Sequence, residues 1–264
     1  MFPLLPFLSP GEVIFFMLVL SRVAGIFAAL PVFGGRRLPL RIRVVTIFMI
    51  TLVSFPALAV SPPQTPSDVF SLALLALSEV MIGLTLSFIT QCVFAAVEFS
   101  GQIIGMQMGL TISSILDPTM GTQTQIMSVV QSLFATLLFL ALNVHHIFIR
   151  TIVDSFRIIP LGGWRISGEL LNFLVMRAAD IFIIGIRLAA PVMVSLLLTS
   201  VALGVMARAF PQMNVFMISM PLNIGMGLII LGVTLTIFIH VLGVTFGNLA
   251  GQAEALYRLM ARGG

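Results

Sequence analysis

The sequence predicts an all-α fold: a polytopic helical membrane protein with about six apolar helical segments and a glycine-rich re-entrant or plug segment. Composition is the first observation behind this prediction. Hydrophobic residues make up 59% of the chain and charged residues only 8%, whereas a typical soluble domain carries about 25% charged residues. The mean hydropathy of +1.18 agrees. The second observation is that no polar linker interrupts the apolar segments, so residues 1–264 are expected to form one helical membrane domain.

The apolar segments have the length of membrane-spanning helices. Roughly 20 apolar residues, rising 1.5 Å each, cross the hydrocarbon core. All segments reach this length except the second, which comes close, and the fifth is too long for one straight span. We therefore expect Pro191 to kink the fifth segment, or its front part, 170–180, to lie along the surface. The segments are 12–33, 42–60, 69–97, 126–149, 170–207 and 213–247.

Charged side chains occur within or beside these apolar segments. Arg22 lies in the middle of the first, Glu79 lies within the third, and Glu98 directly follows the third. A charge in the middle of a bilayer costs about 2.5–3.5 kcal/mol, so such residues normally face a protein interior or a water-filled path. We expect Arg22 to pair with Glu79, and we assign all three residues to intramembrane or subunit contacts.

Three further charges lie in the fifth segment. Arg177, Asp180 and Arg187 are separated by three and seven residues, so they share one helix face. One interpretation is an interfacial stripe that pairs with neighbouring helices. The other is the lining of a subunit interface or a conduit, and the sequence leaves both open.

Residues with catalytic or metal-binding chemistry form no recognisable pattern. His145 and His146 are adjacent, so on a helix they point about 100° apart and do not form an i, i+4 chelating pair. The sequence contains no Ser-His-Asp order, no phosphate-binding glycine loop and no zinc-ligand spacing. The single cysteine, Cys92, permits no intrachain disulfide. We predict that the protein is not an enzyme and has no metal site and no cofactor.

The stretch GQIIGMQMGLTISSILDP, residues 101–118, carries glycine at every fourth position, namely Gly101, Gly105 and Gly109. This spacing makes a flat helix face that another helix can approach closely, and tight packing is one interpretation. Each glycine also weakens the helix by about 1 kcal/mol relative to alanine, and the final Asp-Pro ends it. Irregular backbone at membrane depth is tolerated only inside protein or along a cavity, which favours a re-entrant or plug-like element.

The arginines bear on this element through the positive-inside rule. The basic loop 36–43 is expected to be cytoplasmic, and the loop 61–68, without basic residues, to be external. If 101–118 crosses or re-enters the membrane, only Arg208 among the later loop arginines lies outside. If it does neither, five other arginines lie outside. The alternative is that the chain does not sit in the bilayer as an ordinary polytopic protein.

Four blocks of sequence resemble the family of the flagellar biosynthetic protein FliR and its type III secretion counterparts. The most specific block is FAAVEFSGQIIGMQMGLTISSILDP at 94–118, with its glycine spacing and terminal Asp-Pro. The blocks occur in the family's order, and the likeness covers nearly the whole chain. The other three are SRVAGIFAALPVFGGRRLPLRIR (21–43), LFLALNVHHIFIRTIVDSFRIIPLG (138–162) and RAFPQMNVFMISMPLNIGMGL (208–228).

The resemblance implies a single-copy subunit of the export gate of the flagellar type III secretion system. Such a subunit associates with several copies of FliP and FliQ in the flagellar basal body, beside the membrane proteins FlhA and FlhB. About 1–190 would be FliP-like, and about 191–264 a FliQ-like helix pair. The implied location is the bacterial inner (cytoplasmic) membrane, and the implied substrates are unfolded proteins, with no nucleic acid. An assembly raised above ordinary membrane depth would explain the arginine pattern.

The resemblance also implies that the segment after the glycine run is a plug in the central pore. A hydrophobic constriction blocks water and ions by dewetting, and the glycines would let the segment move aside. The plug residues implied here are Gly109, Leu110, Ile112, Ser113, Ile115, Leu116, Asp117 and Pro118, with Leu110, Ile112, Ile115 and Leu116 as apolar stoppers.

A multi-pass secondary transporter of a small solute is the main alternative function. Transporters often contain inverted repeats with broken helices at matching positions. The break at 101–118 has only a partial counterpart in the second half, MPLNIGMGL at 220–228. A transporter would act alone or as a small homo-oligomer. A membrane-embedded enzyme, the third possibility, lacks paired catalytic residues.

Overall fold

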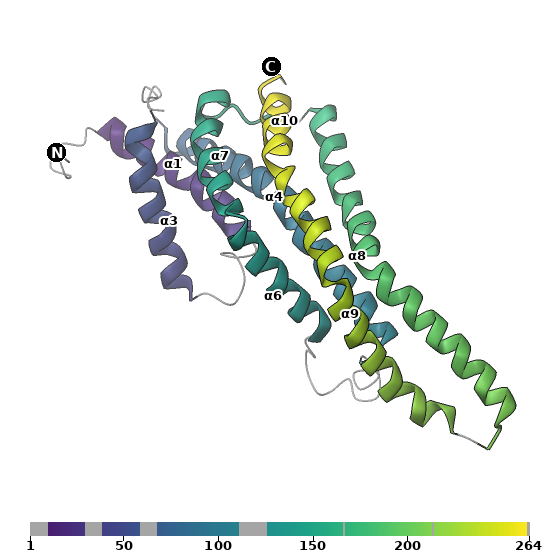
Figure 1. Cartoon of the computed structure of the whole chain (residues 1–264). Helices are drawn as coiled ribbons and strands as arrows, with labels where there is room; N and C mark the ends of the chain where they lie inside the picture. Colours follow the sequence, from purple (N-terminus) through teal and green to yellow (C-terminus); the bar gives the residue numbers. More distant parts are fainter. Residues whose placement is uncertain are drawn as a thin grey trace. The chain divides into compact units, whose positions relative to one another are not determined.

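Helices make up the regular structure of the described chain (Figure 1). A computed structural model describes residues 10–29, 39–58, 68–110, 126–165, 167–212 and 214–262. In chain order the helices are α1 (Pro10–Ala29), α3 (Leu40–Ser54), the short 3-10 helix η1 (Phe55–Ala57), α4 (Val69–Gln107), α6 (Ile126–Ala141), α7 (Val144–Ile158), α8 (Gly168–Ala209), α9 (Val215–Gly247) and α10 (Leu249–Arg262).

The predicted all-α, polytopic membrane class is confirmed. Among the described residues, four helical stretches are long and apolar enough to cross a membrane, or five if α6 and α7 count together as one broken span. The four stretches lie in α1, α4, α8 and the α9–α10 region. The stretches contain 18, 39, 42 and 45 residues, and a helix needs about 17–25 mostly apolar residues to cross a bilayer.

Two of the predicted segments differ from the helices observed. The second, 42–60, overlaps α3, which spans Leu40–Ser54, has only 15 residues and is not a candidate span. The fourth, 126–149, is divided, because α6 ends at Ala141 and α7 begins at Val144. Between them Asn143 adopts a left-handed conformation with φ of 54°. Asparagine is one of the few non-glycine residues that tolerate this conformation, so it can interrupt an otherwise apolar run.

The fifth predicted segment forms one helix, α8, of 42 residues, which includes 170–180 and runs through Pro191. Proline removes a backbone donor from a helix interior. Four residues after the proline, the hydroxyl of Ser195 donates to the carbonyl of Pro191 at 2.8 Å. This bond gives the Pro191 carbonyl a second donor and does not reach the carbonyl of Arg187, which is the one that loses its helical donor at the proline.

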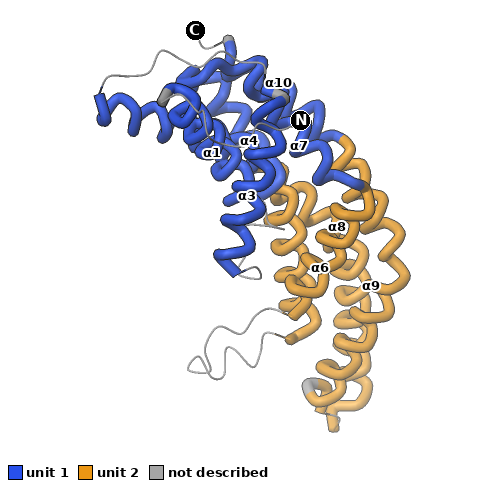
Figure 2. The backbone as a smooth tube through the Cα atoms, turned by 90° about the vertical axis from the view of Figure 1, so that its left-hand side faces the viewer, with its two compact units in different colours: residues 1–91, 143–178, 248–264 blue, residues 92–142, 179–247 orange. Residues whose placement is uncertain are grey.

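The chain divides into two compact units that interleave in sequence (Figure 2). Unit 1 comprises residues 1–91, 143–178 and 248–264, and unit 2 comprises 92–142 and 179–247. Helices α4 and α8 each contribute their first part to unit 1 and their later part to unit 2. The predicted FliP-like and FliQ-like parts concern likeness to other proteins, not internal contacts, and that division stays a prediction.

Unit 1 is held together by aromatic contacts and by one buried hydroxyl. Phe15 and Phe16 of α1 contact the ring of Phe55 in η1, with ring centroids 5.2 and 5.5 Å away. Helix α10 packs on α7, where the hydroxyl of Tyr257 donates to the carbonyl of Thr151 at 2.7 Å. These contacts attach the two ends of the chain to the same unit.

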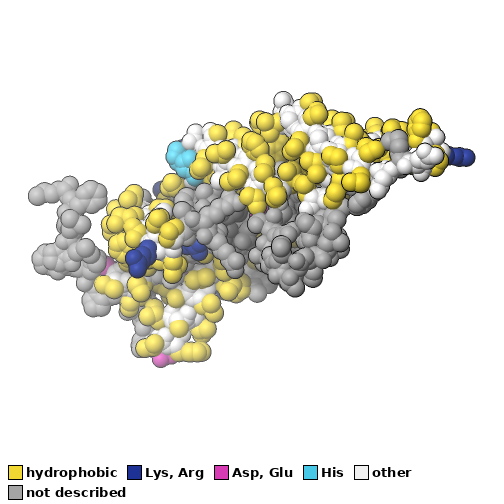
Figure 3. All heavy atoms as spheres, turned by 90° about the horizontal axis from the view of Figure 1, so that it is seen from below, with side chains coloured by type: hydrophobic (Ala, Val, Ile, Leu, Met, Phe, Trp, Pro, Cys, Tyr) yellow, Lys and Arg dark blue, Asp and Glu magenta, His cyan; other side chains and the backbone are white. Residues whose placement is uncertain are grey.

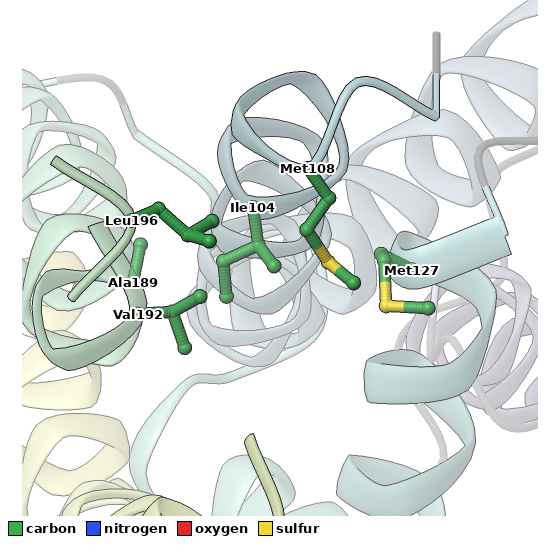
Figure 4. Packing of buried hydrophobic residues seen from close by; sticks show 6 residues of the cluster. All are labelled: Ile104, Met108, Met127, Ala189, Val192 and Leu196. Carbon is green, nitrogen blue, oxygen red and sulfur yellow. The ribbon is translucent and has the colours of Figure 1, made fainter. Parts of the chain in front are cut away.

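The core of unit 2 forms where α4, α6 and α8 meet (Figure 4). Side chains from α9 pack against it. Nearby, the rings of Phe94, Phe139 and Phe246 join α4, α6 and α9, with centroids 5.7 to 5.9 Å apart. The core cluster is at most 7% exposed and consists of Ile104, Met108, Met127, Ala189, Val192 and Leu196.

Large apolar side chains also cover much of the outer surface. Figure 3 shows hydrophobic side chains over much of one face, with few charged side chains among them. Leu198 of α8 is 65% exposed and Val233 of α9 is 72% exposed. Exposed apolar surface on this scale marks contacts with lipid or with other proteins.

Candidate functional site

A buried ion pair joins α1 to α4 within unit 1. The Nε of Arg22 donates to Oε2 of Glu79 at 2.6 Å, and both side chains are completely buried. The structure thus brings together the two mid-segment charges that the sequence suggested as partners. Their burial places them inside protein, where charges of apolar segments are normally found.

The ion pair extends into a network with the end of α7 and the turn that follows. Both Nη atoms of Arg22 donate to the carbonyl of Ile159 at 3.3 Å. The ring of Phe156 lies 4.0 Å from the guanidinium carbon. On the other side, Oε1 of Glu79 accepts the backbone N–H of Gly162 at 2.8 Å. These partners offset the cost of burying the two charges. The same contacts hold α1, α4 and the turn after α7 together.

Two glycines next to the ion pair allow the helices to approach this closely. A Cβ added to Gly25 would lie 2.6 Å from the carbonyl oxygen of Val80, and one added to Gly83 would overlap the carbonyl oxygen of Arg22. Gly25 lies one turn after Arg22 and Gly83 one turn after Glu79, so the crossing holds the charged residues at contact distance. The sequence analysis did not predict this crossing. A signal was present, because Gly25 follows Arg22 by three residues and Gly83 follows Glu79 by four, so each glycine lies on the same helix face as a charge.

The glycine-rich stretch begins as the last turns of α4, and Gly109 ends the helix. Gly109 has φ of +78°. Its N–H donates to the carbonyl of Met106, and the N–H of Leu110 donates to the carbonyl of Gly105, both at 3.0 Å. This pair of bonds is a Schellman motif, in which a left-handed glycine satisfies the last helical carbonyls. The predicted plug residues after Leu110, namely Ile112, Ser113, Ile115, Leu116, Asp117 and Pro118, lie outside the described residues.

The other two glycines of the stretch face α6, at unequal distances. A Cβ on Gly101 would lie 2.5 Å from Cα of Ser128, whereas one on Gly105 would lie 3.7 Å from Cβ of Met127, an ordinary contact. Beside this crossing the hydroxyl of Ser100 donates to Oε1 of Gln131 at 2.5 Å. Gly101 is therefore the position where α4 and α6 approach backbone to backbone.

Met108 occupies the position where α4 meets α9. A Cβ added to Gly227 would lie 2.7 to 2.9 Å from the side-chain atoms of Met108, which is fully buried. A flexible thioether thus fills the space left by a missing side chain. The abundance of methionine and glycine was visible in the sequence, but the pairing of these two residues across 119 positions (227 minus 108) was not.

The remaining predicted charges do not join the ion pair network. The guanidinium carbon of Arg177 lies 5.4 Å from the ring centroid of Phe173, a cation–π contact. Asp180 is half-buried, and Arg187 and Glu98 are exposed. Their assignment to subunit contacts stays a prediction.

No group of three or more metal-ligating side chains occurs in the described part of the chain. His145 and His146 contact each other, with ring centroids 4.3 Å apart.

Comparison with known proteins adds a family match over nearly the whole chain. The family described as bacterial export proteins, family 1, matches residues 13–249. The chain is 33% identical over 209 residues to the flagellar biosynthetic protein FliR of Escherichia coli (strain K12), which covers 79% of each chain. It is 32% identical over 234 residues to that of Bacillus subtilis (strain 168), covering 88% of this chain and 90% of the relative. With the FliR of Pectobacterium carotovorum the identity is 32% over 216 residues, 81% of each chain.

Proposed function

The chain belongs to the bacterial export proteins, family 1, as a relative of flagellar FliR, and from this premise we propose that it is a subunit of the flagellar type III protein export gate. One copy of the chain assembles with several copies of FliP-like and FliQ-like proteins in the basal body. The assembly sits in the bacterial inner membrane, beside FlhA-like and FlhB-like proteins. It forms and plugs the channel through which unfolded export substrates pass, and the chain performs no enzymatic step.

The length and exposure of the apolar helices carry this proposal. Helices α4 and α8 contain 39 and 42 residues, about 58 and 63 Å at 1.5 Å per residue, whereas a hydrocarbon core is about 30 Å thick. Within an 18-residue apolar portion of α8 only 28% of the residues are buried in the chain, and within one of α9–α10 only 11%. Lipid alone does not cover helices of this length, and neighbouring subunits of a larger assembly supply the missing contacts.

The plug part of the proposal draws support from the way α4 ends. The Schellman motif at Gly109 terminates the helix directly before the predicted apolar stoppers Leu110, Ile112, Ile115 and Leu116. The chain therefore leaves α4 at a fixed position, held by the Met108–Gly227 contact. An apolar segment that starts from a rigid helix end can close a channel by dewetting and still move aside.

Native mass spectrometry tests the assembly. The chain is co-expressed with its FliP-like and FliQ-like neighbours and purified in mild detergent. We expect one particle that contains a single copy of this chain and several copies of each partner. A monomer or homo-oligomer, under conditions where the partners are present and folded, would refute the gate and favour the transporter.

A further inference from the structure

The later part of α4, within unit 2, has two faces of opposite character. Val93, Val97 and Ile104 are at most 4% exposed and face the core of the unit. Glu98 and Gln102, one turn apart, are both exposed. Around a helix of 3.6 residues per turn these two lie on the side opposite the buried residues. Polar groups therefore occupy the outward face of this part of an apolar helix.

The outward faces of the other helices of unit 2 are mostly apolar, although Arg187 of α8 and His240 of α9 are also exposed. On α6 the exposed side chains include Phe134 (45%) and Leu137 (63%), and on α8 and α9 they include Leu197 (62%) and Val233 (72%). Between Cys92 and Leu110, by contrast, Met106 is the one large apolar side chain that is exposed, beside exposed Gln102 and Gln107. This face of α4 therefore lacks the run of exposed large apolar side chains that α6, α8 and α9 carry.

A polar helix face in an apolar chain indicates water or a polar neighbour. A charged or amide side chain placed against lipid lacks hydrogen-bond partners, which is costly. The side chains of Glu98 and Gln102 have no hydrogen bond or ion pair with another residue of the described chain. Contact with lipid or with an apolar surface of another subunit, which suits Leu197 and Val233, does not suit them.

We propose that this polar stripe of α4, formed by Glu98 and Gln102, lines the water-filled path of the export gate and contacts the unfolded polypeptide in transit. The inference rests on the proposed function and names the surface of this chain that faces the substrate. It concerns α4 itself and does not involve the residues after Leu110.

The chemistry of the stripe fits an extended polypeptide. Each residue of an unfolded chain carries an unpaired backbone N–H and C=O. The amide of Gln102 offers two donors and an acceptor, and the carboxylate of Glu98 offers acceptors only. Such groups exchange hydrogen bonds with any backbone and with water, so they wet the path without selecting a side chain. An apolar surface there would instead hold hydrophobic side chains of the substrate and slow their passage.

Site-specific photocrosslinking in the assembled complex tests the inference. A photoreactive residue replaces Gln102 or Glu98 in cells that export a substrate whose folded C-terminal domain stalls it in the channel. Controls carry the same residue at Leu197 or Val233, which are exposed and apolar. We expect adducts with the stalled substrate at Glu98 and Gln102 to exceed those at the two controls several-fold.

Adducts of Glu98 and Gln102 that contain only other subunits or lipid, while the complex assembles and exports, would overturn the inference and leave the proposed function intact. Failure of the proposed function has a different signature, because the purified chain then lacks partner subunits altogether.

Thiol accessibility gives a second readout that needs no stalled substrate. The single native cysteine, Cys92, is buried, so a Cys92→Ala background leaves the introduced cysteine as the reporter. In the assembled complex, a charged thiol reagent is expected to modify Gln102→Cys several-fold faster than Leu197→Cys, because thiolate forms only where water reaches the sulfur. Equal protection of both cysteines during export would contradict a water-lined stripe.

Discussion

Arg22 and Glu79 are both withdrawn completely from water, and each compensates the charge of the other. A buried ion pair adds little net stability over a well-packed apolar pair, but removal of one partner leaves an uncompensated charge. Arg22 also donates to the Ile159 carbonyl, and Glu79 accepts from Gly162. At the residue scale the pair therefore selects one arrangement of α1, α4 and the turn after α7.

The substitution Arg22→Met is expected to destabilise the protein by about 3–5 kcal/mol, because Glu79 stays buried without its cation. The double variant Arg22→Met/Glu79→Leu is expected to recover most of this loss. The apparent unfolding temperature of the purified protein measures both effects.

The matched control is Arg258→Met, which breaks the pair with Glu254. Those side chains are 66% and 58% exposed, so the expected change is at most about 1 kcal/mol. A double variant at Arg22 and Glu79 that is no more stable than Arg22→Met would contradict this account of the pair.

Glycines decide how closely the helices pack, but they do so at particular positions. Gly25 and Gly83 bring α1 and α4 together, and Gly101 brings α4 against α6. Gly105, in the same every-fourth-residue series as Gly101, has room for a Cβ. Gly109 serves a different purpose, since its positive φ ends α4. At the element scale, the regular glycine spacing thus contains two different roles, a close helix approach at Gly101 and a helix end at Gly109, and one position, Gly105, with room for a side chain.

The substitution Gly83→Ala is expected to lower the unfolding temperature, because the added Cβ overlaps the backbone of α1. Gly225→Ala is the control, since nothing lies within 4 Å of the added carbon. Alanine favours a helix by about 1 kcal/mol over glycine, so this change should be neutral or stabilising in the purified chain. Equal effects of the two substitutions would rule out the close crossing at Gly83.

Replacement of Gly109 tests the end of α4. Alanine in the left-handed region costs about 1–2 kcal/mol, so Gly109→Ala should fray the last turn, whereas Gly109→Asn should cost less. Hydrogen exchange of the amides of Met108 and Leu110, followed by mass spectrometry, measures the fraying. Unchanged protection in Gly109→Ala would show that the left-handed conformation is not required.

The whole molecule is two units that share α4 and α8, with most of the apolar surface of α8 and α9 turned outward. Such a surface is incomplete without neighbours, which agrees with a subunit of a larger gate. The proposed plug belongs to this scale, because residues 111–118 can seal a channel only when other subunits supply its wall.

Double replacement of Ile112 and Ile115 by glycine is expected to make the assembled complex leak small ions at rest, because the apolar constriction that excludes water is lost. Conductance of the purified complex in a planar bilayer measures the leak. Leucine at both positions is the control, since it keeps the apolar volume and should keep the channel closed. Unchanged conductance of the glycine variant in a fully assembled complex would count against the plug.

Much of the fold followed from local pattern. Hydropathy predicted the helices around Arg22, Glu79 and Pro191, because burial of about 20 apolar residues depends on composition alone. The pattern missed the break at Asn143 and the short length of α3, since helix ends depend on single residues and on packing. For the site, the charges and the glycine series were visible, but Gly25, Gly83 and the contact of Met108 with Gly227 were not.

The sequence by itself determined the membrane class, the helical content and the family, because composition, periodicity and residue order are properties of the chain alone. Only the tertiary structure decided that Glu79 meets Arg22 across 57 positions, that Gly101 but not Gly105 admits a neighbouring backbone, and that the exposed face of α4 beside Glu98 is polar. Contacts between distant residues depend on how whole helices cross, and a crossing is set by the joint packing of many side chains rather than by any local spacing.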